Sequence, residues 1–244
     1  MTNMVRSSRL LGLFAAFAVC SALCLGALAG PAAGLSDAEY REMVEDPDFA
    51  KSDKRLNEVW SGLLKEGGLS KAGIRVLKAD QAQWVRKGRD TQAKILMEGG
   101  STALEAYTAA TRLRADELPG IAGRIFLQDR PDGPQGYYVR RENGRETGWL
   151  SVRWTDKKAG EVSVDAEAIL VLRPDNVRSG LWSGGGAVQK GVLKAPDEEG
   201  EGSATFTFKG DRVQVSTTSD FASGSMGMGV TIEGTYVRQG LPKL

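Results

Sequence analysis

The chain of 244 residues contains no histidine, and it contains only two cysteines, Cys20 and Cys24. Without an imidazole, neither a Ser-His-Asp triad nor a Cys-His pair can form, because both use histidine as the general base. Zinc sites draw mainly on cysteine and histidine and are disfavoured for the same reason. Catalysis by carboxylate, lysine, tyrosine or Ser-Lys groups stays open, but the composition favours a protein that is not an enzyme and that uses no metal or cofactor.

Both cysteines lie in an N-terminal segment that has the pattern of an export signal. Met1–Arg9 carries two positive charges and no acid, Leu10–Ala29 is apolar, and Ala27-Leu28-Ala29 supplies the small residues of a cleavage site. We therefore expect a signal peptide at 1–29, a periplasmic or secreted mature protein, and no membrane span after cleavage.

Two alternatives to a cleaved signal follow from the same segment. An apolar run of about 20 residues is long enough to remain in the bilayer as an uncleaved anchor. Lipid attachment is less favoured, because a small residue should precede the cysteine, whereas Val19 precedes Cys20 and Leu23 precedes Cys24. If the signal is removed, no cysteine remains, so the fold must be stabilised by burial and hydrogen bonds rather than by disulfides.

Positive and negative charges are almost equal in number. The whole chain has 32 basic and 31 acidic residues, and loss of the signal would leave 30 and 31. Neither half of the mature chain has the basic excess that recruits nucleic acid. We therefore expect no nucleic-acid partner.

Residues 35–118 have the apolar spacing of helices, with a start and a stop signal for each of three helices. The residues that cap the starts are Asp46 (before Pro47), Ser70 and Thr102 (with Glu105). The pairs expected to end the helices are Gly67-Gly68, Gly99-Gly100 and Pro119-Gly120. Such short connections predict a small antiparallel helical bundle.

Residues 120–244 change to short runs of alternating apolar and polar residues between turn-forming segments. The clearest hairpin is TFTFKGDRVQV at 205–215, with a two-residue turn at Gly210-Asp211. Several such strands predict an antiparallel β-barrel or sandwich. The expected fold is therefore α+β in two separable domains, a helical domain at 35–118 and an all-β domain at 120–244.

Three segments of the helical part carry a resemblance to a known family. They are DPDFAKSDKRLNEVWSGLL at 46–64, QAQWVRKGRD at 81–90 and TRLRADEL at 111–118. In order and spacing they resemble the N-terminal domain of the LprI-type lysozyme-inhibitor family. The matching positions are Asp53, Leu56, Asn57, Gln81, Trp84, Arg89, Asp90, Thr111, Arg114, Glu117 and Leu118. The resemblance implies an inhibitor that acts by protein–protein contact, with lysozyme or another glycosidase as its partner.

The chain departs from that family pattern in two ways. The family usually has paired cysteines around these helices, where this chain has Val44, Ala93 and Ala106 or Tyr107. The family arginine usually follows the tryptophan by four residues, whereas Arg89 follows Trp84 by five. On an α-helix that difference is a rotation of about 100°.

The charged motif positions have a structural interpretation beside the functional one. We expect Arg89, Asp90, Arg114 and Glu117 to form ion pairs or caps within the helical domain. We likewise expect Trp84 to lie in the core. We also expect the motif positions Gln81 and Thr111 to be structural.

In the β half, the segment LWSGGG at 181–186 is a candidate for partner binding. Its glycines allow a close approach of the backbone, and Trp182 would be the aromatic anchor beside Gly184 and Gly185. The alternative is a loop whose tryptophan packs back onto the end of the barrel.

Two further functions stay open. The β domain could hold a small apolar or cell-wall ligand inside its barrel, which small residues and methionines around a cavity would favour and packed Phe, Val and Leu would disfavour. The third hypothesis is a hydrolase that uses carboxylates alone, with Glu161, Asp165 and Glu167 as the candidates.

Overall fold

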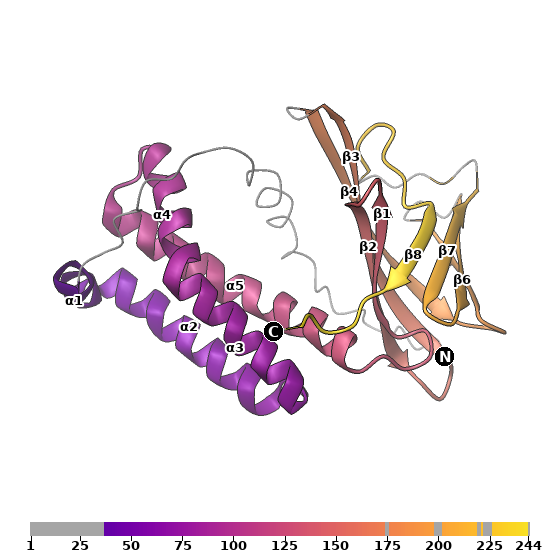
Figure 1. Cartoon of the computed structure of the whole chain (residues 1–244), viewed down its shortest axis with the longest axis horizontal. Helices are drawn as coiled ribbons and strands as arrows, with labels where there is room; N and C mark the ends of the chain where they lie inside the picture. The colour runs from indigo at the N-terminus through magenta and orange to yellow at the C-terminus, as the bar shows by residue number, and fades with distance from the viewer. Residues whose placement is uncertain (1–36, 174–175, 198–201, 219–220, 222–225, 244) are drawn as a thin grey trace, which may run out of the picture.

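The computed structural model describes residues 37–173, 176–197, 202–218, 221 and 226–243 (Figure 1). The expected signal peptide at 1–29 lies outside these residues. Within them, a helical region is followed by an antiparallel sheet that curls into a nearly closed barrel, so the α+β class is confirmed. No helix in the described part of the chain is long and apolar enough to cross a membrane.

The helical region begins each main helix at the capping residue that the sequence predicted. Its elements are α1 (Asp37–Glu45), α2 (Pro47–Glu66), α3 (Lys71–Gln83), the π-helical turn η1 (Trp84–Gly88), α4 (Arg89–Glu98) and α5 (Ala103–Asp129). Asp46 caps α2, Ser70 caps α3, and Thr102 forms a full capping box with Glu105 at the start of α5. These local signals held because each is satisfied by backbone N–H groups only two or three residues away.

The third predicted helix does not end at Pro119-Gly120, and that prediction is wrong. α5 continues to Asp129 with Pro119 in its interior. A proline inside a helix removes one backbone hydrogen bond and costs about 3 kcal/mol. Continuing the helix buries Ile121 and Ile125, which are 5% and 2% exposed, and each such side chain stabilises the fold by about 1.5–3 kcal/mol. Burial therefore outweighs the proline.

The core of the helical region reaches past the boundary predicted at residue 118. Ile121, Ala122 and Ile125 pack with Leu77 and Leu118 in one buried cluster. Asp129, the last residue of α5, accepts hydrogen bonds from the backbone N–H and the hydroxyl of Ser70, both at 2.9 Å. The last turns of α5 are thus tied to the start of α3, and the helical region extends to Asp129.

The sheet has eight strands, and every pair of neighbours is antiparallel. The strands are β1 (Gly136–Glu142), β2 (Arg145–Asp156), β3 (Glu161–Arg173), β4 (Asn176–Ala187), β5 (Val192–Pro196), β6 (Ser203–Lys209), β7 (Arg212–Thr217) and β8 (Gly234–Arg238). Their order is β4-β3-β2-β1-β8-β7-β6-β5, so the last strand pairs with the first. The two edge strands, β4 and β5, also contact each other, which almost closes the barrel.

The hairpin predicted at 205–215 is confirmed in detail. Lys209 pairs with Arg212 across the two-residue turn, and Phe206 pairs with Val215. Phe206 and Val215 both point into the barrel. Alternation of apolar residues fixed the register here because a slip of one residue would turn the apolar side chains outward.

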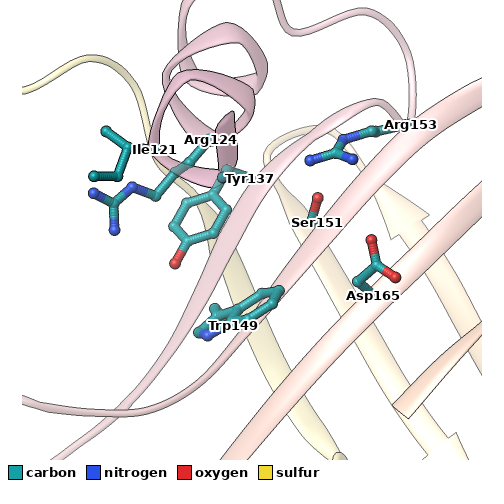
Figure 2. Close-up of a pocket in the computed structure, with 8 residues that line it drawn as sticks. Ile121, Arg124, Tyr137, Trp149, Ser151, Arg153 and Asp165 are labelled. Atoms are coloured by element: carbon teal, nitrogen blue, oxygen red, sulfur yellow. The ribbon is translucent and has the colours of Figure 1, made fainter. Parts of the chain in front are cut away.

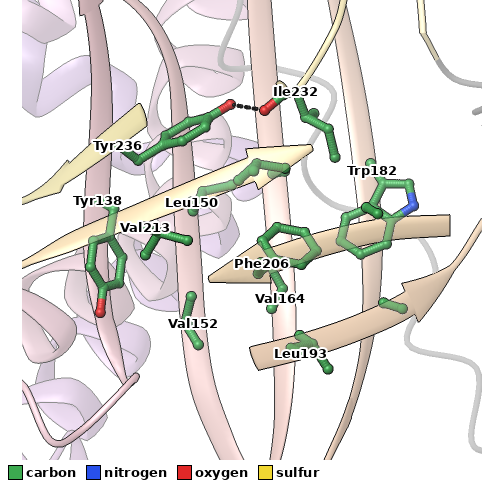
Figure 3. Packing of buried hydrophobic residues seen from close by; sticks show 14 of the residues in the cluster. Tyr138, Leu150, Val152, Val164, Trp182, Leu193, Phe206, Val213, Ile232 and Tyr236 are labelled. Atoms are coloured by element: carbon green, nitrogen blue, oxygen red, sulfur yellow. Dashed lines mark hydrogen bonds between the residues drawn. The ribbon is translucent and has the colours of Figure 1, made fainter. Parts of the chain in front are cut away.

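The barrel interior is a packed core rather than a cavity for a ligand (Figure 3). Leu150, Val164, Leu193, Phe206 and Val213 fill it and are completely or almost completely buried. By the criterion set from the sequence, this filling favours a structural barrel. The barrel interior is therefore not favoured as a binding site for a ligand.

The proposal that Trp182 is an exposed anchor is contradicted by its position. LWSGGG belongs to strand β4, and the Trp182 ring is 1% exposed and stacks on Phe206 with ring centroids 5.5 Å apart. A Cβ atom on Gly184 would lie 2.4 Å from that ring, and one on Gly185 would lie 2.4 Å from the carbonyl oxygen of Val162. The glycines therefore make room for the ring and for β3, not for a partner.

Replacing Pro119 with alanine tests whether α5 is continuous. The Pro119 side chain is exposed, so the Pro119→Ala variant loses no packing and regains a helical hydrogen bond. We expect the free energy of unfolding, measured by denaturant titration, to rise by about 1–3 kcal/mol. Leu113→Ala, at another exposed position of α5, should leave it nearly unchanged. A loss of stability in Pro119→Ala would contradict a helix that runs unbroken to Asp129.

Candidate ligand-binding cleft

The second half of α5 lies next to strands β1 and β2 of the sheet (Figure 1). A cleft lies between them. Its larger part is a groove of about 510 Å³ between α3 and α5 on one side and β1, β2 and the chain after β8 on the other. We call this part the outer groove. Its polar lining comes from Asp80, Gln83, Gln128, Arg141, Glu146 and Gln239.

The cleft continues into a smaller pocket of about 60 Å³, which we call the inner pocket (Figure 2). Ile121, Arg124 and Tyr137 line both parts, so the inner pocket and the outer groove are neighbours along one surface. Trp149, Ser151, Arg153 and Asp165 complete the inner pocket from the sheet, and Gly120 completes it from α5.

The strand register explains why these side chains meet. Tyr137 of β1 pairs with Ser151 of β2, and Ser151 pairs on its other side with Asp165 of β3. Residues two apart on a strand share a face, so Trp149 and Arg153 flank Ser151 on the same outer face. The barrel interior takes the alternate residues Leu150 and Val152. The outer face is therefore polar and aromatic, and α5 covers it.

Ser151 is the most unusual group in the inner pocket. Its side chain is 6% exposed, and its hydroxyl has no hydrogen-bond partner. A buried polar group without a partner costs about 1–3 kcal/mol. Such a cost is ordinarily avoided in a stable fold, so the hydroxyl marks a position where an outside group can supply the missing bond.

An aromatic pair forms the wall between Ser151 and the outer groove. The Tyr137 and Trp149 rings stack with centroids 6.0 Å apart and an angle of 28°. Burial raises the pKa of Tyr137 to about 12, although the nearby Arg124 guanidinium acts in the opposite direction. The phenol therefore remains protonated at neutral pH and able to donate a hydrogen bond.

Glu167 of β3 lies beside Trp149, its cross-strand partner on the outer face of the sheet. The Trp149 Nε1–H donates to Oε2 of Glu167 over 2.6 Å, and the Glu167 side chain is 5% exposed. Burial raises the pKa of this carboxyl above 4.5, with the hydrogen bond from Trp149 opposing the rise. The hydrogen bond to Glu167 therefore fixes the orientation of the Trp149 ring.

The three acids considered for a carboxylate hydrolase all lie on the outer face of β3. Asp165 accepts a hydrogen bond from the Ser183 hydroxyl at 2.9 Å, Glu167 is bonded to Trp149, and Glu161 is exposed at the start of the strand. Acids on one strand do not face each other from opposing walls of a cleft. That arrangement lacks the facing pair that the hydrolase hypothesis requires.

The family-motif positions lie elsewhere, between α3 and α5, with Arg114 at their centre. The Arg114 side chain donates to Gln81 Oε1 at 2.9 Å and also pairs with Asp80 and, at 3.9 Å, with Glu117. Its guanidinium carbon lies 5.5 Å from the centre of the Trp84 ring. These residues bind one another and hold the helices together.

The other motif positions form a second cluster around α4. Arg89 contacts Asp90 at 3.9 Å and lies over the Tyr107 ring, and the Tyr107 hydroxyl donates to Asp90 at 3.1 Å. Thr111 is also buried in this helix interface, with 2% of its side chain exposed. The structure thus brings Gln81, Trp84, Arg114 and Glu117 into one packing cluster and Arg89 with Asp90 into another, and none of these residues lines the inner pocket.

The π-helical turn η1 accounts for the shifted position of Arg89. The Arg89 N–H donates to the carbonyl of Trp84, five residues earlier. A π-turn therefore absorbs one additional residue and returns Arg89 to the place one turn after Trp84. The rotation of about 100° expected on an α-helix is removed.

Sequence reasoning missed Arg124, Tyr137, Trp149, Ser151 and Arg153 as site residues. Their one signal was the alternation of the strands, which puts aromatic and charged side chains on an outer face that would otherwise meet solvent. That signal marks a site only where a helix covers the face, and the covering part of α5 was expected to belong to the all-β domain at 120–244. Among the residues that the structure describes, no group of three potential metal ligands comes together.

Comparisons with protein families, with characterised proteins and with solved structures find no match to this chain. Its function is therefore inferred from its own residues and their geometry.

Glu167→Gln tests the buried carboxyl beside Trp149. Because the folded-state pKa is raised above 4.5, the acid stabilises the fold fully only below that pH, and its contribution is lost as the pH rises through the folded-state pKa. A glutamine keeps an oxygen for Trp149 and carries no charge. We expect the variant to be more stable than the natural protein at pH 7, with the difference shrinking toward pH 4.

The measurement is the free energy of unfolding across this pH range. Glu161→Gln, an exposed position on the same strand and face, is the matched control and should show no such trend. A stability difference for Glu167→Gln that stays constant with pH would contradict a buried, destabilised carboxylate.

Proposed function

We propose that this protein is an exported binding protein of the cell envelope and that its ligand lies in the cleft between α5 and the outer face of the barrel. The observation that carries this proposal is the inner pocket, where the buried Ser151 hydroxyl has no partner and opens toward a larger groove. Small-molecule sites favour boundaries between packed units and combine an apolar wall with a few convergent polar groups. The cleft has both properties.

The shape and lining of the cleft favour a polar, elongated ligand over an apolar one. The outer groove is lined by carboxylates, guanidinium groups and side-chain amides, and the inner pocket adds Arg124, Arg153 and Asp165. A fully apolar ligand would leave these groups without partners and would lose affinity. The barrel interior, the position first considered for a ligand, is already filled by Trp182 and Phe206.

Binding rather than catalysis is proposed because the cleft offers contacts and no base of the usual kind. The chain has no histidine, and Glu167 already accepts a hydrogen bond from Trp149. The location in the envelope is proposed from the N-terminal export pattern. A soluble cell-wall fragment would meet the protein in that compartment.

Gln128→Trp tests the proposed position of the ligand. Gln128 lines the outer groove, and an indole there would occupy part of its 510 Å³. The natural protein would be titrated calorimetrically with soluble disaccharide peptides, oligosaccharides, short peptides and lysophospholipids. We expect saturable binding of one class, weakened at least about 10-fold by Gln128→Trp because a blocked groove loses contact area.

Gln189→Trp, at an exposed turn away from the cleft, is the matched control and should bind like the natural protein. Equal weakening by both variants, or no binding by any class of compound, would overturn the proposed cleft.

A second candidate function is the inhibition of a lysozyme-like glycosidase, in keeping with the LprI-type resemblance. The π-turn supports it, because η1 returns Arg89 to the position relative to Trp84 that the family pattern has. The motif residues themselves face other helices and are used in packing. A partner would therefore contact the exposed side chains of η1 and α4, among which Val85 and Ile95 are 46% and 49% exposed.

The double variant Val85→Lys and Ile95→Lys tests this second function. If the natural protein inhibits a chicken-type lysozyme on cell-wall substrate, the two lysines should weaken inhibition at least about 10-fold. Their charges would lose water in the interface, and they would repel a basic enzyme. Val171→Lys with Val177→Lys, an exposed pair on β3 and β4, is the control and should inhibit normally. Absence of inhibition by the natural protein at high excess would end this candidate.

A further inference from the structure

The polar groups of the inner pocket form a set whose members need different partners. Figure 2 shows Ser151, Arg153 and Asp165 together on one side of the pocket, and Arg124 with Tyr137 on the other. An arginine only donates hydrogen bonds, a carboxylate only accepts them, and a hydroxyl does both. The chemistry of a ligand can therefore be inferred from which groups would form hydrogen bonds with Ser151, Arg153 and Asp165 together.

Each of the three has capacity left for a ligand. The Ser151 hydroxyl has no partner, and no described carboxylate forms an ion pair with Arg153. Asp165 uses Oδ1 to accept from Ser183, which leaves Oδ2 available. The guanidinium of Arg153 is held close to α5, because one of its nitrogens lies 2.9 Å from the point where a Cβ atom of Gly123 would be.

Resting on the cleft proposed above, we propose that the inner pocket recognises a neutral saccharide by its hydroxyl groups. One hydroxyl of a sugar ring can donate to Asp165 while accepting from Arg153, and its neighbour can bond to Ser151. Ser151 and Asp165 are cross-strand partners and Arg153 lies two residues from Ser151 on the same face, so the three side chains are close enough to contact one ring.

Charged ligands fit this set less well. A carboxylate or phosphate would accept from Arg124 or Arg153 but would face the like charge of Asp165, and an amine would face both arginines in the same way. A hydrocarbon would leave all three groups without partners. The aromatic wall of Trp149 and Tyr137 completes the argument, because a sugar ring has an apolar C–H face that can be buried against such rings.

The sizes of the two spaces agree with this ligand. A cavity needs about 10–15 Å³ to hold one water molecule. At about 60 Å³ the inner pocket has room for one hydroxyl-bearing edge of a ring. The rest of an oligosaccharide would extend past Tyr137 into the outer groove, where amide side chains of Gln83 and Gln128 can both donate and accept.

Three trisaccharides of different charge test the proposal on the whole mature protein. They are the neutral trimer of N-acetylglucosamine, the cationic trimer of glucosamine and the anionic trimer of galacturonic acid, each titrated by calorimetry. We expect the neutral trimer to bind at least about 10-fold more tightly than either charged one, because only the charged probes meet a like charge in the pocket.

Asp165→Asn tests whether the carboxylate itself binds the sugar or whether the sugar only fits into the pocket. Without the carboxylate, binding of the neutral trimer should weaken about 10-fold, since a hydrogen bond to a charged acceptor is lost, while the anionic trimer should gain affinity relative to it. Ser151→Ala should weaken the neutral trimer by about 3- to 10-fold. Asp211→Asn, at the exposed β6–β7 turn, is the control and should leave all three affinities unchanged.

The outcomes distinguish this inference from the proposed cleft. If a peptide or lipid binds and Gln128→Trp blocks it while no trisaccharide binds, the cleft stands and the saccharide is wrong. Tighter binding of a charged trimer, or an unchanged affinity in Asp165→Asn, also overturns the saccharide alone. If no compound of any class binds, both proposals fail together.

Discussion

Helix α5 is the element on which the other parts of this structure depend. It packs against α2, α3 and α4 in the helical region and also contacts β1 and β2 of the sheet. The same helix thus contributes Leu118 and Ile125 to the helical core and Gly120 and Arg124 to the inner pocket. Continuity through Pro119 is therefore the constraint that sets where the barrel lies relative to the helices.

The glycines of α5 show how closely this contact is fitted. Arg153 of β2 reaches the helix at Gly123, where any larger residue would meet its guanidinium. Gly120 lines the inner pocket and Gly123 faces Arg153, so this side of the helix is small where it meets the sheet. The pocket thus exists because a helix with small residues on one side covers a polar sheet face. That combination also explains how a buried hydroxyl without a partner can persist next to a well-packed fold.

Features that depend on near neighbours in sequence were predictable, and features that depend on distant ones were not. Asp46, Ser70 and Thr102 cap helices through bonds to residues two or three positions away, and the hairpin at 205–215 carries its own turn. The end of α5 was missed because the local rule for proline was outweighed by burial against α2 and α3. The inner pocket was missed for the same reason, since three of its lining residues, Gly120, Ile121 and Arg124, lie in the part of α5 that was expected to belong to the β domain.

The π-turn indicates that the residues of the family-like motif serve helix packing rather than ligand binding. Relative to the four-residue spacing of the family that it resembles, the five-residue spacing of Trp84 and Arg89 would rotate everything after it by about 100° on an α-helix. Instead η1 absorbs it, and Arg89 still contacts Asp90 and Tyr107. A helix forms a π-turn when the packing contacts on both sides of the turn stabilise the fold by more than the irregular turn costs. The geometry of η1 therefore keeps these side chains packed. The motif is thereby explained by helix–helix contacts, and the groups still able to bind a ligand lie outside it, on the second half of α5 and on β1 to β3.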